Sequence, residues 1–94
     1  MRFDWDDTKN AINLRKHGIR FETATRVFDD PNQLLLFARS VDGEERWQTT
    51  GLVDGVYMLL VVHTIEDMDD DEVYRLISAR KAEPHERRIY DEGL

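Results

Sequence analysis

Arginine, histidine and tyrosine residues gather at a few places in this 94-residue chain, and their side chains suit one kind of chemistry. Cleavage of RNA without a metal ion needs a base for the 2′-hydroxyl, cations for the charge that develops on phosphorus, and an acid for the 5′-oxygen. Arginine binds phosphate through its forked guanidinium group, and histidine or tyrosine can transfer protons. The residues that could supply these groups are Arg46, His63, Arg75, Arg80, Arg87, Arg88 and Tyr90.

Most of these residues also have an ordinary structural interpretation, which the sequence alone leaves open. Arg46 begins the alternating polar stripe of RWQTT, as expected for the solvated side of a strand. His63 ends an apolar run, where a histidine is more often a hydrogen-bonded core residue than a catalyst. Arg75 and Arg80 have an odd separation, so they lie on opposite faces of a regular strand unless a bulge or a strand end intervenes. The basic residues near the C-terminus can form salt bridges with Glu83, Glu86 and Asp91.

The composition limits the class of protein. A chain of this length forms a single domain over 1–94, and 40% hydrophobic with 35% charged residues is typical of a globular protein. The net charge of −7 argues against a general nucleic-acid binder, although a local basic site is compatible with it. The absence of cysteine excludes disulfides and thiolate chemistry. Without a secretion signal or an apolar run that could span a bilayer, a cytoplasmic location and no membrane partner are expected.

Neither a metal nor a cofactor is expected. The sequence lacks the glycine-rich phosphate-binding and dinucleotide-binding motifs and the H-E-x-x-H zinc motif. Its histidines, His17, His63 and His85, are too scattered for a convincing metal site. The acidic run at 66–72 lacks the glycine and the terminal bidentate glutamate of an EF-hand, and it is predicted to be a solvated loop.

The first third of the chain predicts a short strand followed by two short antiparallel helices. Residues 2–5 alternate charged and aromatic side chains, as a strand does. Residues 6–18 have a capping side chain at Asp7 or Thr8 and a terminal glycine. Residues 21–31 repeat a helical apolar period and end at Asp-Asp-Pro. The apolar stripe of the first helix is expected from Ala11, Ile12 and Leu14.

After Pro31 the pattern changes to that of strands. Four strands are predicted, at 33–38, 46–53, 56–64 and 73–79. Tight turns are expected at the two Asp-Gly pairs, and a last helix at 83–92. The third of these strands is apolar on both faces, which indicates a central position and a cover on each side, from the last helix or from a partner chain. The order β-α-α-β-β-β-β-α indicates an α+β fold.

Four segments together resemble one protein family, the BrnT toxins of type II toxin–antitoxin modules. The matching segments, in the family's order and at similar spacing, are FDWDDTKNAINLRKHGIRFETATRVFDDP, DGEERWQTTG, LLVVHT and RLISARKAEPHERRIY. The resemblance covers nearly the whole chain and implies a RelE-like fold, a small antiparallel sheet with two N-terminal helices on one face and a C-terminal helix. It also implies an RNA-cleaving toxin that inhibits translation. A BrnA-like antitoxin would neutralise it and supply the only contact with DNA.

Carried over to the matching positions, the resemblance assigns roles to individual residues. Arg80 in SAR becomes the main phosphate and transition-state ligand, and Arg46 in EERW a second phosphate contact. His63 in VVHT becomes a proton-transfer group, and Tyr90 in RRIY an acid or a support. Further candidates for RNA contact are Arg75, Arg87 and Arg88, with Lys9, Lys16 and His17 on the first helix, which either belong to the RNA surface or only cap and solvate that helix.

The acidic run at 66–72 departs from the family, whose toxins commonly carry a basic residue there. Carboxylates within about 10 Å of a phosphate site weaken RNA binding. Two other readings therefore stay open. One is a catalytically weak binding module that acts as antitoxin partner and transcriptional corepressor, and the other is an acidic protein whose basic helix only pairs with its acidic loop. The RNA preference, the need for ribosomes, and the state as monomer, homodimer or hetero-oligomer with antitoxin are also open.

Overall fold

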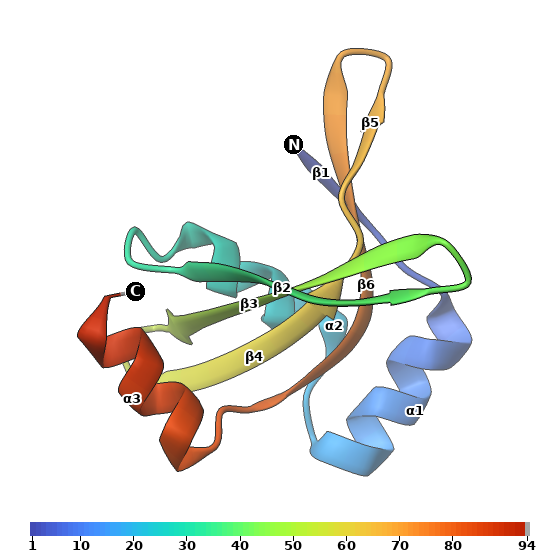
Figure 1. Cartoon of the computed structure of the whole chain (residues 1–94). Helices are drawn as coiled ribbons and strands as arrows, with labels where there is room; N and C mark the ends of the chain where they lie inside the picture. Colours follow the sequence, from blue (N-terminus) through green and yellow to red (C-terminus); the bar gives the residue numbers. More distant parts are fainter. Residues whose placement is uncertain (94) are drawn as a thin grey trace.

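The computed structural model describes residues 1–93, which form a mixed β-sheet flanked by helices (Figure 1). Within these residues there are six strands, three α-helices and one 3₁₀ helix. In chain order the elements are β1 (Arg2–Asp4), α1 (Asp7–His17), α2 (Phe21–Ala24), the 3₁₀ helix η1 (Thr25–Asp29), β2 (Leu34–Val41), β3 (Glu44–Val53), β4 (Tyr57–His63), β5 (Glu66–Met68), β6 (Asp71–Lys81) and α3 (Pro84–Glu92). No helix in this range is long and apolar enough to cross a membrane.

The strand order is β1-β6-β4-β3-β2, and β5 pairs with the first part of β6. All neighbours are antiparallel except β1, which runs parallel to β6. β4 lies in the centre, which confirms the prediction from its apolar residues on both faces. The α+β class is confirmed, but the predicted order of elements is wrong because it lacks β5.

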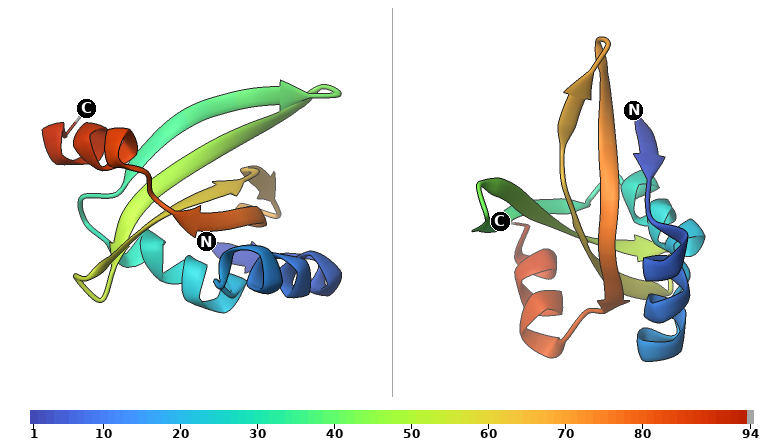
Figure 2. Two further views of the ribbon diagram at one scale, coloured as in Figure 1. Left: turned by 90° about the horizontal axis from the view of Figure 1, so that it is seen from below. Right: turned by 90° about the vertical axis from the view of Figure 1, so that its right-hand side faces the viewer.

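Helices cover both faces of the sheet. α1, α2 and η1 lie on one side of it and α3 lies on the other (Figure 2). Strand side chains alternate between the two faces, so one set packs under α1, α2 and η1. The most buried residues of this helix-side core, each at most 1% exposed, are Phe21, Ala24, Val27, Val61, Leu76 and Ala79. On the opposite face Leu60 is 2% exposed, so the two-faced β4 is covered on both sides within the chain.

The acidic run at 66–72 is part of an exposed hairpin, which corrects the expected loop. β5 pairs with residues 71–73 of β6, and the turn lies at Asp69 and Asp70. Both turn residues have positive φ, 52° and 65°, a conformation that aspartate tolerates better than most residues. Two such residues match the twist of a tight hairpin, so the chain turns back despite its like charges. The hairpin extends away from the rest of the molecule (Figure 1).

Helix α1 packs against the sheet with a polar residue, which corrects the expected apolar stripe. Ile12 and Leu14 are 46% and 38% exposed, whereas Asn13 is only 5% exposed. The Asn13 amide donates to the carbonyl oxygens of Ile19 and Ala79, each at 2.9 Å, and its Oδ1 accepts from the Ala79 N–H at 3.1 Å. Hydrogen bonds to the outer edge of β6 therefore fix α1 where an apolar face was expected to do so.

The helix boundaries also differ from the expected ones. α1 is capped by Asp6, whose Oδ1 accepts from the N–H groups of Thr8 at 2.8 Å and Lys9 at 3.1 Å, and not by Asp7 or Thr8. The second helical segment is a single α turn, α2, that continues as η1. A tightening of the last turns to 3₁₀ geometry is a common way for a short helix to end.

Candidate functional site

Arginine side chains from three strands share the sheet face opposite α1 and α2. Val61 lies in the helix-side core, so the preceding Leu60 and its partner on β6, Arg80, point to the other face. On β3, Thr50 pairs with Leu60, and Arg46 lies an even number of residues away and shares that orientation. Arg46 and Arg80 therefore project from the same face of the sheet. The β3 residue level with Arg80 is Thr50, so Arg46 lies four residues further along β3.

A β-bulge in β6 brings Arg75 to the same face as Arg80. The pairing of β6 with β4 skips Ile77, which lies between Ser78 and Leu76. Leu76 remains in the helix-side core, so the adjacent Arg75 points to the opposite face. In a regular strand the odd separation of Arg75 and Arg80 would place them on opposite faces. The extra residue, Ile77, places them on the same face.

A second bulge, in β2, adds an arginine that the sequence had not singled out. The pairing of β2 with β3 skips Ala38, so Arg39 lies directly opposite Arg46. Like charges directly opposite each other destabilise a sheet, and an anion between them removes that penalty. The sequence signal, an arginine after an apolar run, is too common to have identified this residue. We use the term arginine face for the set Arg39, Arg46, Arg75 and Arg80.

Glu44 lies between two residues of the arginine face. Arg75 Nη2 donates to Glu44 Oε2 at 2.7 Å, and Arg46 Nε is 3.6 Å from Glu44 Oε1. A second carboxylate, Glu66 of the acidic hairpin, is 3.9 Å from Arg75. The hydrogen bond from Arg75 lowers the pKa of Glu44, and the same bond raises the pKa of Arg75. Arg46 Nε is buried without a hydrogen-bond partner in residues 1–93.

Arg80 is held by a carboxylate of α3. Its two terminal nitrogens donate to the two oxygens of Glu86 at 2.7 and 2.8 Å, the forked geometry in which arginine also binds phosphate. Glu86 additionally accepts from the N–H of Glu83 at 2.8 Å and so caps the first turn of α3. The hydrogen bond from Arg80 lowers the pKa of Glu86, so this carboxylate is ionised at neutral pH.

The arginine face is locally positive in an acidic protein. Four arginines face three carboxylates, Glu44, Glu66 and Glu86, which leaves one positive charge, while the whole chain carries −7. Of the four, Arg39 has no salt bridge to any residue in 1–93. An anionic ligand can therefore bind Arg39 directly. To bind any of the other three arginines, it must first displace a carboxylate partner.

His63 lies on the opposite face of the sheet and is 0% exposed. Its Nδ1 donates to the carbonyl oxygen of Thr64 at 3.0 Å, and its Nε2 accepts from the hydroxyl of Thr49 at 2.8 Å. The ring stacks on Tyr74 at 4.7 Å and meets Phe28 edge-on at 5.2 Å. Burial lowers its pKa, which keeps the ring neutral. Of the two interpretations that the sequence left open, this position favours the hydrogen-bonded core histidine over the proton-transfer group.

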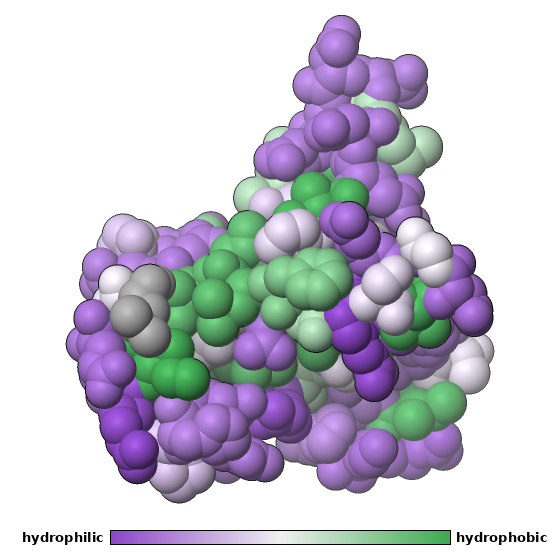
Figure 3. Space-filling view, viewed as in Figure 1, coloured by the Kyte–Doolittle hydropathy of each residue, from purple (hydrophilic) through white to green (hydrophobic). Residues whose placement is uncertain are grey.

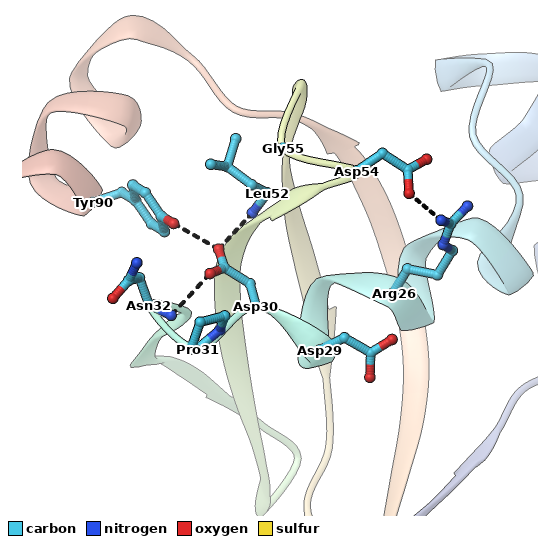
Figure 4. Close-up of a pocket in the computed structure, with 9 residues that line it drawn as sticks. All are labelled: Arg26, Asp29, Asp30, Pro31, Asn32, Leu52, Asp54, Gly55 and Tyr90. Carbon is cyan, nitrogen blue, oxygen red and sulfur yellow. Dashed lines mark hydrogen bonds and ion pairs between the residues drawn. The ribbon is translucent and has the colours of Figure 1, made fainter.

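Tyr90 anchors α3 to the body of the protein. Its hydroxyl donates to Asp30 Oδ2 at 2.6 Å, an oxygen that also accepts from the Leu52 N–H at 2.8 Å, while Asp30 Oδ1 accepts from the Asn32 N–H at 2.8 Å (Figure 4). Burial and the hydrogen bond to Asp30 raise the pKa of Tyr90 to about 12. A phenol of this kind is a poor proton donor, so of the two expected roles the geometry favours support.

The pocket beside Tyr90 is acidic and suits no phosphate. It has a volume of about 370 Å³, and three aspartates, Asp29, Asp30 and Asp54, line it (Figure 4). Its one arginine, Arg26, is paired with Asp54. Burial acts to raise the pKa of Asp30, but the hydrogen bonds from Leu52, Tyr90 and Asn32 together lower it, so its negative charge persists.

The remaining predicted residues lie away from the arginine face or at its margin. Lys9, Lys16 and His17 are on α1, on the other side of the sheet. Arg87 and Arg88 are exposed on α3 and form no salt bridge within residues 1–93. The expected partner Glu86 binds Arg80, and Glu83 lies 3.6 Å from His85. In the described part of the chain no three histidine, aspartate or glutamate side chains are close enough to hold a metal ion.

Comparisons with known proteins agree with this description. A family model described as the ribonuclease toxin BrnT of a type II toxin–antitoxin system matches residues 5–86. Among solved structures, the chain is similar to the ribonuclease toxin BrnT of Brucella abortus, with 24% sequence identity and a TM-score of 0.65 over 88% of this chain and 97% of that one. That likeness shows a shared fold. A comparison with curated proteins gave no match.

Proposed function

Since this chain belongs to the BrnT family of ribonuclease toxins of type II toxin–antitoxin systems, we propose that it is a metal-independent endoribonuclease that uses the arginine face. In this proposal the toxin is cytoplasmic, has the RelE-like arrangement of sheet and helices, and inhibits translation by cutting RNA. A BrnA-like antitoxin neutralises it and connects it to DNA.

The observation that carries the proposal is the gathering of four arginines on one face by two β-bulges. Each bulge adds one residue to a strand, at Ala38 and at Ile77, and each turns an arginine toward the same side. Bulges are frequent beside active sites because they redirect a side chain without changing the fold. The opposed pair Arg39 and Arg46 is unfavourable by itself, and a bound phosphate would relieve that repulsion.

Arg80 is the proposed main phosphate ligand. The fork that now binds both oxygens of Glu86 has the geometry to bind two phosphate oxygens instead. When the 2′-oxygen attacks phosphorus and the bond to the 5′-oxygen breaks, negative charge develops on the phosphoryl oxygens, where Arg80 and Arg46 stabilise it. Preorganised donors of this type contribute about 10²–10³ in rate each.

Glu44 is the proposed base that takes the proton from the 2′-hydroxyl. It is the carboxylate that lies between Arg46 and Arg75, so it is beside the proposed second phosphate contact, Arg46. Its lowered pKa makes it a weak base that is always ionised at neutral pH, and the leaving 5′-oxygen takes its proton from solvent. His63 is buried on the other face and has no part in this step.

One observation favours the second candidate function, a catalytically weak module that acts as antitoxin partner and corepressor. Arg75 and Arg80 are already paired with carboxylates, and the acidic hairpin contributes one of these. RNA must displace these partners, which reduces its affinity. Cleavage of RNA separates the two functions.

The test is digestion of total RNA by the purified protein in excess EDTA, with two matched variants. Arg80→Ala removes the proposed phosphate ligand, and Arg15→Ala removes an exposed arginine of α1, on the other side of the sheet. We expect cleavage by the parent and by Arg15→Ala, and a loss of about 10²–10³ in rate for Arg80→Ala with an unchanged circular dichroism spectrum. Equal cleavage by all three would refute the role of Arg80.

Intact RNA with all three proteins would be followed by the same assay in a translating extract. Cleavage there identifies a toxin that requires the ribosome. Intact RNA in the extract as well supports the binding module and overturns the enzymatic proposal.

A further inference from the structure

The two outer edges of the sheet differ in how far their backbone N–H and carbonyl groups are covered. On the β6 edge, β1 pairs with residues 73–75, and further along the strand the side-chain amide of Asn13 binds both the N–H and the carbonyl of Ala79. A strand edge with free N–H and carbonyl groups is a template for another strand, and natural proteins cover or charge such edges. The β6 edge is covered in this way.

The β2 edge is not covered in this way, and its only protections are Arg39 and the bulge at Ala38, both in its second half. β2 pairs only with β3 among the described strands, so alternate N–H and carbonyl groups along its eight residues point outward. Leu35, Leu36 and Phe37 follow one another in the middle of this strand and are 43%, 36% and 53% exposed. No charged residue and no proline interrupts residues 34–38. Figure 3 shows the apolar band that this strand forms on the molecular surface.

The charges at the two ends of β2 indicate what pairs with it. Asp42 and Glu45 are exposed near its last residues with Arg39, which leaves an excess of one negative charge there, and Asp29 is exposed shortly before its first residue. A second copy of this chain, added antiparallel about a two-fold axis, would place the acidic end of one β2 near the acidic end of the other. The overall charge of −7 adds to that repulsion. A segment with basic ends fits the same edge without it.

We infer that the exposed edge of β2 is a docking site for an extended segment of the antitoxin, one that alternates apolar residues and carries lysine or arginine at both ends. The segment adds a strand to the sheet: its backbone pairs with the outward N–H and carbonyl groups, and alternate side chains cover Leu36 on one face and Leu35 and Phe37 on the other. Membership of a type II toxin family implies the antitoxin, and the surface and the chemistry of the segment come from this structure.

The test uses two synthetic peptides and two variants of the full chain. Both peptides have the same alternating valine and threonine core, and one has two lysines at each end where the other has two glutamates. Phe37→Lys places a charge on the β2 edge. Met68→Lys is the matched control, because Met68 is similarly exposed, at 45%, in the strand β5 of the acidic hairpin.

We expect the lysine-ended peptide to bind the parent and Met68→Lys, and to bind Phe37→Lys at least tenfold more weakly. Hydrogen exchange of the bound parent should show new protection at alternate amides of β2, which distinguishes added strand pairing from general apolar contact. The glutamate-ended peptide should bind at least tenfold more weakly than the lysine-ended one.

Three results would overturn the inference. Equal binding of the two peptides removes the charge argument, and failure of the lysine-ended peptide to bind removes the docking site. A concentration-dependent dimer of the parent that Phe37→Lys abolishes identifies a second copy as the occupant. These binding measurements are independent of RNA cleavage, so an inactive enzyme that still binds the peptide contradicts only the proposed function.

Discussion

The two faces of the β-sheet use the same strands for opposite purposes. His63 on the helix side is fully buried, and its two ring nitrogens are satisfied by Thr49 and Thr64. Arg80 on the other side is 35% exposed and is satisfied by Glu86, a partner that an anion can replace. The comparison teaches that the type of side chain is a weak guide to function. The face on which the backbone places it, and the exchangeability of its partners, decide what it does.

The strongest challenge to this comparison is to truncate the buried residue. His63→Ala should lower the free energy of unfolding by about 3–5 kcal/mol. It leaves a cavity, and it leaves the Thr49 hydroxyl and the Thr64 carbonyl without their hydrogen-bond partner. Chemical denaturation measures this change, with His63→Gln as a milder variant that retains one hydrogen bond. Cleavage of RNA per folded molecule should be unchanged. A stable His63→Gln protein that has lost cleavage would restore the catalytic role and break the comparison.

The arginine face is tested by the carboxylate beside it. Glu44→Gln should slow RNA cleavage by about 10²-fold, because it removes the proposed proton acceptor while the arginines remain. RNA affinity in a filter-binding assay should hold or increase, since one competing negative charge is lost. Glu66→Gln is the matched control, because Glu66 also approaches Arg75 but is not assigned to the reaction. A faster Glu44→Gln enzyme would show that Glu44 only neutralises the face.

The pH dependence of stability sharpens the contrast between the faces. Burial lowers the pKa of His63 in the folded protein, so below the usual value of about 6.5 the unfolded chain binds a proton that the folded chain does not. The free energy of unfolding should therefore fall as the pH decreases through about 6.5, by up to about 1.4 kcal/mol per pH unit from this residue. Denaturation at several pH values measures the slope. The prediction fails if His63→Gln retains the same slope.

The smallest expected effect concerns Tyr90, the residue that anchors α3 to the body of the protein. Tyr90→Phe should lower the free energy of unfolding by about 1 kcal/mol, because one hydrogen bond to Asp30 is lost and its carboxylate keeps two N–H donors. The same denaturation experiment measures it, and RNA cleavage should stay within a factor of two or so. A hundredfold loss of cleavage by a stable Tyr90→Phe protein would establish this phenol as a catalytic acid.

Much of the fold was predictable because it depends on local patterns. The Asp-Gly turns, the apolar run of β4 and the proline at the start of α3 are each visible in a few consecutive residues. The hairpin at Asp69 and Asp70 was missed because a run of acids resembles a solvated loop, while its turn depends on a backbone conformation that aspartate merely tolerates.

The candidate site was less predictable, because it depends on tertiary contacts. The bulges at Ala38 and Ile77 have no signature in ordinary apolar residues, yet they decide which way Arg39 and Arg75 point. Asn13 looks like a residue of the solvated side of a helix, and only the open edge of β6 gives it a partner. Arg46 and Arg80 were candidates from the sequence and share one face, but Glu44 was not named, and Glu86 was expected to pair with the arginines of α3 and not with Arg80.

The bulge at Ile77 also bears on how this gene can change. In a regular strand, deletion of one codon reverses the orientation of every following residue and exchanges buried for exposed side chains. Here β6 contains one residue more than its pairing with β4 requires. Loss of the Ile77 codon would leave Arg75 and Arg80 an even number of residues apart, on the same face of a strand without a bulge. At this position an in-frame deletion can thus be a milder mutation than at its neighbours, and lineages that differ in length here can keep the same face.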